Sequence, residues 1–424
     1  MVTAVILIFV IGYLVIALEQ PLKLDKAAAA LLTGVLCWTV YMFSGVVKDT
    51  AIAELLSHFS EISSILFFLL GAMTIVELID NHDGFSIITD KIKTRSKVNL
   101  LITITILTFF ISSVLDNLTT TIVMTSLMMK LLDNKTDRLW FTGMIIIAAN
   151  AGGAFSPLGD VTTTMLWIGG QISALNIIKQ LFIPSIFVCI VPLLIIARKF
   201  RKQRFIFSNN SDQFVSKKDS IVVLLSGILL LLFVPVFKTI THLPPFMGML
   251  LSLSVLWFII SILHLKKVPD QKHKLSVSYA LKTIDTPSIL FFLGILLAVS
   301  ALQSFGILKQ LATFFDQTLG NIYLTGTALG IVSSIVDNVP LVAAAQGMYD
   351  LSVYPTDHHF WELIALTTGT GGSALIIGSA AGVAAMGMVK IDFMWYLKNI
   401  SWIALLGFIT GILVFIFQNQ FFNF

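Results

Sequence analysis

The feature that most constrains this chain is a series of apolar runs, each about as long as a bilayer is thick. They lie at 2–18, 27–47, 61–80, 181–197, 220–237, 246–264, 285–305 and 400–417. About 20 apolar residues in a helix cross the hydrocarbon core. Charged residues make up only 12% of the chain, against about 25% in soluble domains. The sequence therefore predicts an all-α polytopic membrane protein and excludes a soluble enzyme, a disordered protein and a nucleic-acid-binding protein.

The first run is expected to stay in the mature protein. The segment MVTAVILIFVIGYLVIALEQ has no basic n-region and no small-x-small cleavage site, so we interpret it as a membrane helix rather than a signal peptide. Cys37 and Cys189 both lie in apolar runs. Two such cysteines are too few for a disulfide framework or a metal site, and no cofactor is expected.

Two further stretches, 98–170 and 321–390, are apolar but interrupted by Asp-Asn pairs, Gly-Gly pairs and Pro. They resemble each other. SSVLDN (112–117) recurs as SSIVDN (333–338). The first copy is preceded by SILFFLLG (64–71) and followed by NAGGAFSPLGD (150–160). The second copy is preceded by SILFFLG (288–294) and followed by GTGGSALIIGS (369–379). Three matched blocks in the same order indicate an internal duplication.

The distribution of positive charge predicts that the two repeats are inverted. We let the first helix run from outside to inside, and let each interrupted stretch contain a hairpin (98–133 and 321–357) that enters and leaves on one side. Of the 27 Lys and Arg, all then fall on the cytoplasmic side except Lys48, Lys179, Lys238 and Lys309. This agrees with the positive-inside rule. The threading predicts a multi-pass protein of the cell inner (plasma) membrane with both termini outside.

Inverted repeats with interrupted helices are typical of secondary transporters, whose substrate site lies near the midplane where the interruptions meet. Unwound backbone is tolerated at membrane depth only where it is buried in protein or lines a wet cavity. Exposed carbonyls and helix ends at such interruptions can bind ions.

Asp116 and Asn117 are the first candidates for an ion site. A carboxylate at this depth costs about 2.5–3.5 kcal/mol on insertion scales, so it indicates function. Asn117 and the threonines that follow, including Thr120, add neutral oxygens that suit a hard cation such as sodium. Ser112 and these threonines could instead simply hold helices together.

Asp160 is the second candidate acid. It follows Ser156-Pro157-Leu158-Gly159, where Pro removes a backbone donor and Gly relaxes the backbone, so a helix is expected to break there. Asn150 precedes the break, and Thr162 and Thr163 follow it. The alternative is that Asp160 only caps the half-helix 161–170, although capping and ion binding are compatible.

The second half repeats the pattern with fewer acids. Asp337 and Asn338 match the first pair, but the Gly-Gly segment has Ser373 and Ser379 where an acid could stand. We therefore expect one dominant cation site in the first half. Glu77, inside the run 61–80, could relay protons or only pack; for His58 and Glu61, near the outer end, an ordinary interfacial role is favoured.

An exchange mechanism follows from electrostatics. Burial disfavours an ionised carboxylate and a bound cation favours it, so a proton and a metal ion compete for one group. If Asp116 and Asp160 lie close together, their repulsion couples the two titrations. Such a pair holds either protons or Na⁺.

At these residues the chain resembles a known family. DNLTTTIVM, NAGGAFSPLGDVTTTMLW and LFFLLGAMTIVELID look like the NhaD family of Na⁺/H⁺ antiporters, in the ion transporter superfamily, and the similarity runs from about residue 50 to the C-terminus. The resemblance implies a homodimer in which a scaffold carries a mobile, elevator-type transport domain. It also implies export of Na⁺ or Li⁺ in exchange for protons at alkaline pH, hence a role in pH homeostasis.

With this resemblance the chain divides into scaffold helices of repeat 1 (1–97), its transport hairpin and broken helix (98–200), a cytoplasmic linker (201–218), scaffold helices of repeat 2 (219–306), and its hairpin and broken helix (307–424). By position, the resemblance carries ion-binding and proton-exchange roles to Asp116, Asn117, Asn150, Asp160, Thr162, Thr163, Ser333, Asp337 and Asn338, and less directly to Ser373 and Ser379. Asp116, Asn117 and Asp160 are the predicted Na⁺ ligands.

Several rival functions are alternatives to cation exchange. An exporter of arsenite or another oxyanion could share the fold, but a neutral or anionic substrate gains nothing from Asp116 and Asp160 together. A carboxylate substrate is also disfavoured, because no Arg lies inside any apolar run. An intramembrane aspartyl protease would need two aspartates, but Pro157 replaces the first Gly of its Gly-x-Gly-Asp signature. A passive cation channel would not need acids that titrate.

Overall fold

The computed structural model describes residues 1–17, 24–85, 87, 94, 96–201, 203, 216–265, 275–335, 337–376 and 378–421. The first half contains α1 (Val2–Ala17), α3 (Lys26–Met42), α4 (Lys48–Asn81), α6 (Lys97–Ser112), α7 (Asn117–Leu131), α8 (Lys135–Ala154), α9 (Val161–Ile168) and α10 (Ala174–Lys199). The second contains α11 (Lys217–Thr241), α12 (Pro245–Leu263), α14 (Val277–Thr283), α15 (Thr286–Ser304), α16 (Ile307–Leu319), α17 (Ile322–Val332), α18 (Asn338–Met348), α19 (His359–Gly371), α20 (Ala380–Val389), α21 (Phe393–Tyr396), the π-helical turn η1 (Leu397–Ser401) and α22 (Trp402–Phe421).

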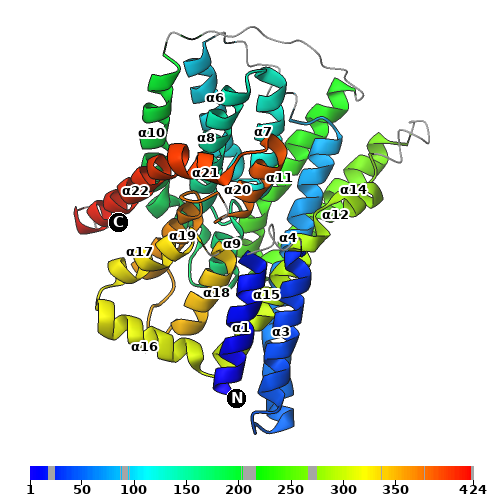
Figure 1. The fold of residues 1–424 in the computed structure, drawn as a ribbon. Helices are drawn as coiled ribbons and strands as arrows, with labels where there is room; N and C mark the ends of the chain where they lie inside the picture. The colour runs from blue at the N-terminus through cyan, green and yellow to red at the C-terminus, as the bar shows by residue number, and fades with distance from the viewer. Residues whose placement is uncertain are drawn as a thin grey trace.

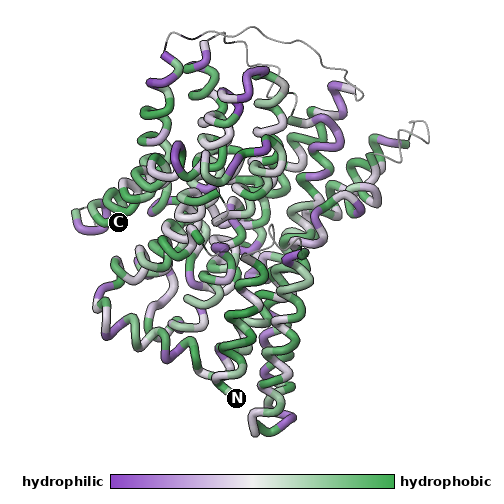
Figure 2. The backbone as a smooth tube through the Cα atoms, in the orientation of Figure 1, coloured by the Kyte–Doolittle hydropathy of each residue, from purple (hydrophilic) through white to green (hydrophobic). Residues whose placement is uncertain are grey.

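Six of the described helical segments are long and apolar enough to cross a membrane: α4, α10, α11, α12, α15 and the continuous segment 393–421. Hydrophobic residues also extend along most of the shorter helices (Figure 2). The prediction of an all-α polytopic membrane protein is thereby confirmed.

The helices follow the apolar runs with local differences. The run 61–80 is the second part of α4, which begins at Lys48 and has 34 residues. The stretch after 305 forms α16, a separate amphipathic helix. Most of the predicted linker 201–218, and the basic tract 266–274, lie outside the described residues.

The interruptions fall at the predicted Asp-Asn and Gly-Gly segments. α6 ends at Ser112 and α7 begins at Asn117, while α17 ends at Val332 and α18 begins at Asn338. α8 ends just after its Gly-Gly pair and α19 ends at the first glycine of its pair, Gly371; α9 and α20 begin after Asp160 and Ser379. Four helices therefore start near the centre of the molecule (Figure 1).

Glycines let the interrupted helices pack closely. A Cβ added to Gly152 of α8 would lie 2.1 Å from the carbonyl oxygen of Phe109 in α6. A Cβ added to Gly371 of α19 would lie 2.1 Å from the carbonyl oxygen of Gly330 in α17. Side chains larger than hydrogen cannot occupy either position without moving a helix, so the first glycine of each Gly-Gly pair is required by packing between a hairpin and a broken helix.

The remaining helices form a second group of contacts. α3 packs against α1 and α15, and α12 packs against α11 and α4. α10 and α22 pack against each other and also against the interrupted helices, α10 on α8 and α22 on α19. Figure 1 shows α1, α3 and α15 side by side in one half of the molecule, and α6, α7 and α8 together in the other, with the short helices α9 and α20 between them.

Candidate functional site

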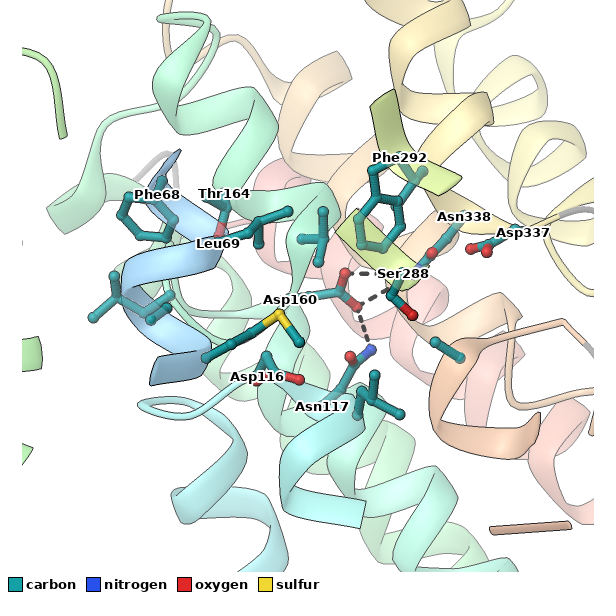
Figure 3. Close-up of a pocket in the computed structure, with 17 residues that line it drawn as sticks. Phe68, Leu69, Asp116, Asn117, Asp160, Thr164, Ser288, Phe292, Asp337 and Asn338 are labelled. Carbon is teal, nitrogen blue, oxygen red and sulfur yellow. Dashed lines mark hydrogen bonds between the residues drawn. The ribbon is translucent and has the colours of Figure 1, made fainter. Parts of the chain in front are cut away.

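The four helix starts surround a small pocket with a volume of about 40 Å³. Its polar lining consists of three acids and two amides, Asp116, Asp160, Asp337, Asn117 and Asn338, together with Ser288 and Thr164. Phe68 and Leu69 of α4 and Phe292 of α15 form apolar walls (Figure 3). A pocket of this size holds a few water molecules at most, because one water needs about 10–15 Å³ measured in this way.

Asp160 is the centre of the hydrogen-bond network. It is 1% exposed. Asn117 Nδ2, from the tip of the first hairpin, donates to its Oδ2 (2.8 Å), and Asn338 Nδ2, from the tip of the second, lies 3.4 Å from both oxygens. Residues from both halves of the chain thus converge on one carboxylate (Figure 3).

Asp160 also caps α9. Its Oδ1 accepts hydrogen bonds from the Thr162 amide (2.9 Å) and the Thr162 hydroxyl (2.8 Å). Asp160 therefore does cap the half-helix, as the alternative interpretation predicted. Capping, however, uses only one of its two carboxylate oxygens. The other oxygen faces the amides of the hairpin tips, so the cap orients the carboxylate toward the pocket.

Asp116 is the N-cap of α7 and lines the same pocket. Its Oδ1 accepts from the Thr119 amide (2.8 Å) and its Oδ2 from the Thr119 hydroxyl (2.6 Å). Each carboxylate oxygen has a second lone pair in addition to the one used here. Asp116 can therefore accept a proton or coordinate a cation while it still caps α7.

Asn150 connects the two interrupted helices. Its Oδ1 accepts from Asn117 Nδ2 (3.0 Å), and its own Nδ2 lies 2.8 Å from Ser373 Oγ and 3.2 Å from Ser379 Oγ. Asn150 is fully buried. The serines that replace an acid in the second half therefore bind an amide of the first half.

Asp337 is held differently from the other two acids. Its side chain makes no capping bond to α18, and its Oδ1 is buried without a hydrogen-bond partner among the described residues. Its backbone amide donates to the hydroxyl of Tyr13 in α1 (3.1 Å). Asp337 is thus an unsatisfied acceptor beside the pocket, which is an unusual arrangement for a purely structural carboxylate.

Several other predicted residues lie outside the pocket and form hydrogen bonds that hold the hairpins and the broken helices together. Ser112 Oγ donates to the carbonyl of Ala149 (2.6 Å), and Ser333 Oγ donates to the carbonyl of Thr368 (2.8 Å). These two matched bonds fasten each hairpin to its broken helix. Thr163 Oγ1 lies 3.4 Å from the carbonyl of Ala154, across the break.

The remaining candidates do not line the pocket. Ser156 Oγ accepts from the Leu158 amide within the break. Thr120 is buried in α7, and its hydroxyl has no partner among the described residues. Glu77 accepts from Asn81 Nδ2 (3.3 Å) in the last turns of α4. A role for Glu77 in proton relay stays a prediction.

Sequence reasoning did not select Ser288, which lines the pocket from α15. The signal was present, since Ser288 opens the second SILFF block and Ser64 opens the first. Among the threonines after Asn117, Thr119 and not Thr120 is the hydrogen-bond partner of Asp116. The aromatic walls had no local signal, because Phe residues occur in most spans.

The chain matches the model of the CitMHS family, described as a citrate transporter, over residues 7–369. It is 47% identical, over 96% of its length, to sodium/proton antiporter 1 of Arabidopsis thaliana, 71% of which is covered, and 45% identical, over 98% of its length, to sodium/proton antiporter 2, 99% of which is covered. It is 31% identical, over 98% of its length, to the Na⁺/H⁺ antiporter NhaD of Vibrio cholerae, 92% of which is covered. The helical membrane fold and these relatives agree: the chain is a transporter and not an enzyme, and it belongs to the NhaD family of the ion transporter superfamily.

Proposed function

We propose that this protein exchanges Na⁺ for protons across the membrane. The observation that carries the proposal is the convergence of Asn117 and Asn338 on the buried carboxylate of Asp160, in a pocket also lined by Asp116 and Asp337. Carboxylate and amide oxygens suit a hard monovalent cation, and a pocket of about 40 Å³ suits an ion without its full hydration shell. The relatives named as sodium/proton antiporters support the same assignment.

Exchange follows from competition at the acids. An ionised carboxylate is costly in this buried site unless a cation or a proton compensates its charge. Na⁺ and H⁺ therefore displace each other from Asp160 and Asp116, with Asn117 as a further ligand of the metal ion. Li⁺ is expected to be accepted as well, because it is also a hard monovalent cation that oxygen ligands bind.

Movement of the site is proposed to follow an elevator mechanism. Supporting observations are the sequence repeat, the matched packing of α6 on α8 and of α17 on α19, and the separate group formed by α1, α3, α4, α11, α12 and α15. We assign the hairpins and broken helices (98–200 and 307–424) to the transport domain and the other group (1–97 and 219–306) to the scaffold. The two halves are inverted repeats, and the protein is a homodimer in the plasma membrane with both termini outside.

Citrate, an anion, and arsenite are the alternative substrates to Na⁺. Citrate is suggested by the family description, but three carboxylates around the pocket would repel it. The pocket is also far below the roughly 300 Å³ that organic ligands usually occupy. Arsenite would fit by size, yet it gains no stabilisation from acids that it cannot neutralise. Charge therefore favours a cation.

The test uses proteoliposomes that contain a pH-sensitive dye and an imposed proton gradient. Na⁺ or Li⁺ should dissipate the gradient, whereas K⁺, arsenite and citrate serve as competing substrates. Asp116→Asn should abolish the response, and Asp160→Asn should raise the Na⁺ concentration for half-maximal activity or abolish exchange. The matched control is Asp137→Asn, an acid-to-amide change at the far end of α8, where Asp137 pairs with Lys97 (2.6 Å) outside the pocket. Full Na⁺ exchange in Asp116→Asn would refute the site, and a response to arsenite alone would refute the substrate.

A further inference from the structure

A second cavity adjoins the central pocket. Its volume is about 240 Å³, and it shares Leu118, Ser288 and Ala380 with the lining of the central pocket. A larger cavity of about 570 Å³, lined by residues that include Glu61 and Gln346, shares none of its described lining residues with the central pocket. The smaller cavity is here called the Lys26 vestibule, after the basic residue among its described lining residues.

The vestibule contains a positive charge. Besides the shared residues it is lined by Asp25, Lys26 and Asp285. Both acids are helix caps: Asp25 Oδ1 accepts from the Ala27 amide (2.8 Å), and Asp285 Oδ1 accepts from the Ser288 amide (3.2 Å). Lys26 forms no ion pair with a carboxylate of the described residues, and its ammonium lies over the ring of Phe291, 5.0 Å from the centroid. Its charge is therefore not cancelled by direct contact.

Lys26 lines the vestibule next to the pocket that Asp160 and Asp337 line. Tyr13 of the neighbouring helix α1 contacts the backbone of Asp337. The N-terminal helices thus contribute a hydroxyl from α1 and, in the adjoining cavity, a fixed positive charge from α3. The hydroxyl contacts the acid of the pocket whose Oδ1 lacks a hydrogen-bond partner among the described residues.

The two sides of the site differ in this respect. Asp285 precedes Ser288 by three residues, as Glu61 precedes Ser64, and each pair lines one cavity, with Asp285 and Ser288 in the vestibule. α12 packs against α4 as α3 packs against α15. α12, however, begins with PFMGML and has no charged residue in its first turn, where α3 begins with Lys26. Of these two helix starts, α3 alone therefore carries a fixed positive charge.

We propose that Lys26 is a positioning residue that limits cation affinity: its fixed charge weakens Na⁺ binding in the central pocket while the pocket adjoins the vestibule. This inference rests on the proposed Na⁺/H⁺ exchange. Three carboxylates around so small a pocket would bind a monovalent cation tightly, but transport requires that the ion also leave. A unit charge on the order of 10 Å away, at an effective dielectric constant of about 20, changes an affinity by roughly one order of magnitude.

The experiment compares Lys26→Gln and Lys26→Arg with the wild type in proteoliposomes at one alkaline pH. Loss of the charge should lower the KM for Na⁺ by roughly tenfold. Lys26→Arg should keep the KM near that of the wild type. Lys48→Gln is the matched control, since Lys48 also begins a helix but lines none of the three cavities. A second readout, stabilisation of the purified variants against heat by Na⁺, should show the same gain in affinity for Lys26→Gln.

The outcomes separate this inference from the proposed function. Wild-type protein that shows no Na⁺-driven proton flux would refute Na⁺/H⁺ exchange and, with it, the role of Lys26. Wild-type exchange with an unchanged KM in Lys26→Gln would refute the role of Lys26 alone. An equal change of the KM for Na⁺ in Lys26→Gln and Lys26→Arg would also refute the role of Lys26, because a lysine with a purely structural role gives that pattern.

Discussion

Replacing Asn150 with alanine is expected to loosen the contact between the two interrupted helices. The side chain is fully buried and makes three hydrogen bonds, one from Asn117 and one each to Ser373 and Ser379. Alanine removes all three and leaves buried partner groups without a hydrogen bond. The change therefore affects both the stability of the fold and the position of Asn117 beside Asp160.

The magnitude can be worked from those bonds. A buried hydrogen bond contributes about 0.5–1.5 kcal/mol net in soluble proteins, and side-chain bonds inside membrane proteins average about 0.6 kcal/mol. Three bonds therefore correspond to a loss of about 2–4 kcal/mol in the free energy of unfolding. Asn117 also loses the acceptor that fixes its amide, so its donation to Asp160 becomes less well oriented.

The assay has two parts, and Thr142→Val is the matched control. Thr142 lies in the same helix, is fully buried, and has a hydroxyl without a partner among the described residues. Thermal unfolding in detergent should show a melting temperature several degrees lower for Asn150→Ala and unchanged or higher for Thr142→Val. Dye-loaded proteoliposomes should show a raised KM for Na⁺ in Asn150→Ala only. A melting temperature and KM equal to those of the wild type would refute the view that Asn150 joins the two helices.

Two further predictions follow from the packing and the caps. Gly152→Ala should destabilise the fold by about 1–3 kcal/mol, the usual cost of overpacking, because the new methyl group would meet the carbonyl of Phe109 in α6; a melting temperature equal to that of the wild type would contradict this. Thr119→Val removes the hydroxyl that donates to Asp116 Oδ2 (2.6 Å) but keeps the backbone cap, so exchange should persist with an altered dependence on pH. Measurement of flux across a pH series checks it, and a profile identical to that of the wild type would show that the hydroxyl does not act on Asp116.

Much of the fold could be predicted from local sequence. The spans follow from the lengths of the apolar runs, and the interruptions at 113–116 and 155–160 follow from Ser-Ser-x-x-Asp-Asn and from Pro157 with Gly159. A helix start needs a cap and a break needs Pro or Gly, and both requirements concern residues that are neighbours in the chain. The blocks around Asp116 and Asp160 also sufficed to place the chain in its family.

The assembly of the site depends on tertiary structure. Asn338 reaches Asp160 across 178 positions of sequence, and Tyr13 reaches Asp337 across 324. Neither contact leaves a periodic or compositional signal, because it depends on how whole helices pack and on which direction each side chain points. For the same reason Lys26 could be counted in the sequence only as one cytoplasmic charge among many. Its place in the vestibule next to the central pocket is set by the packing of α3 on α15.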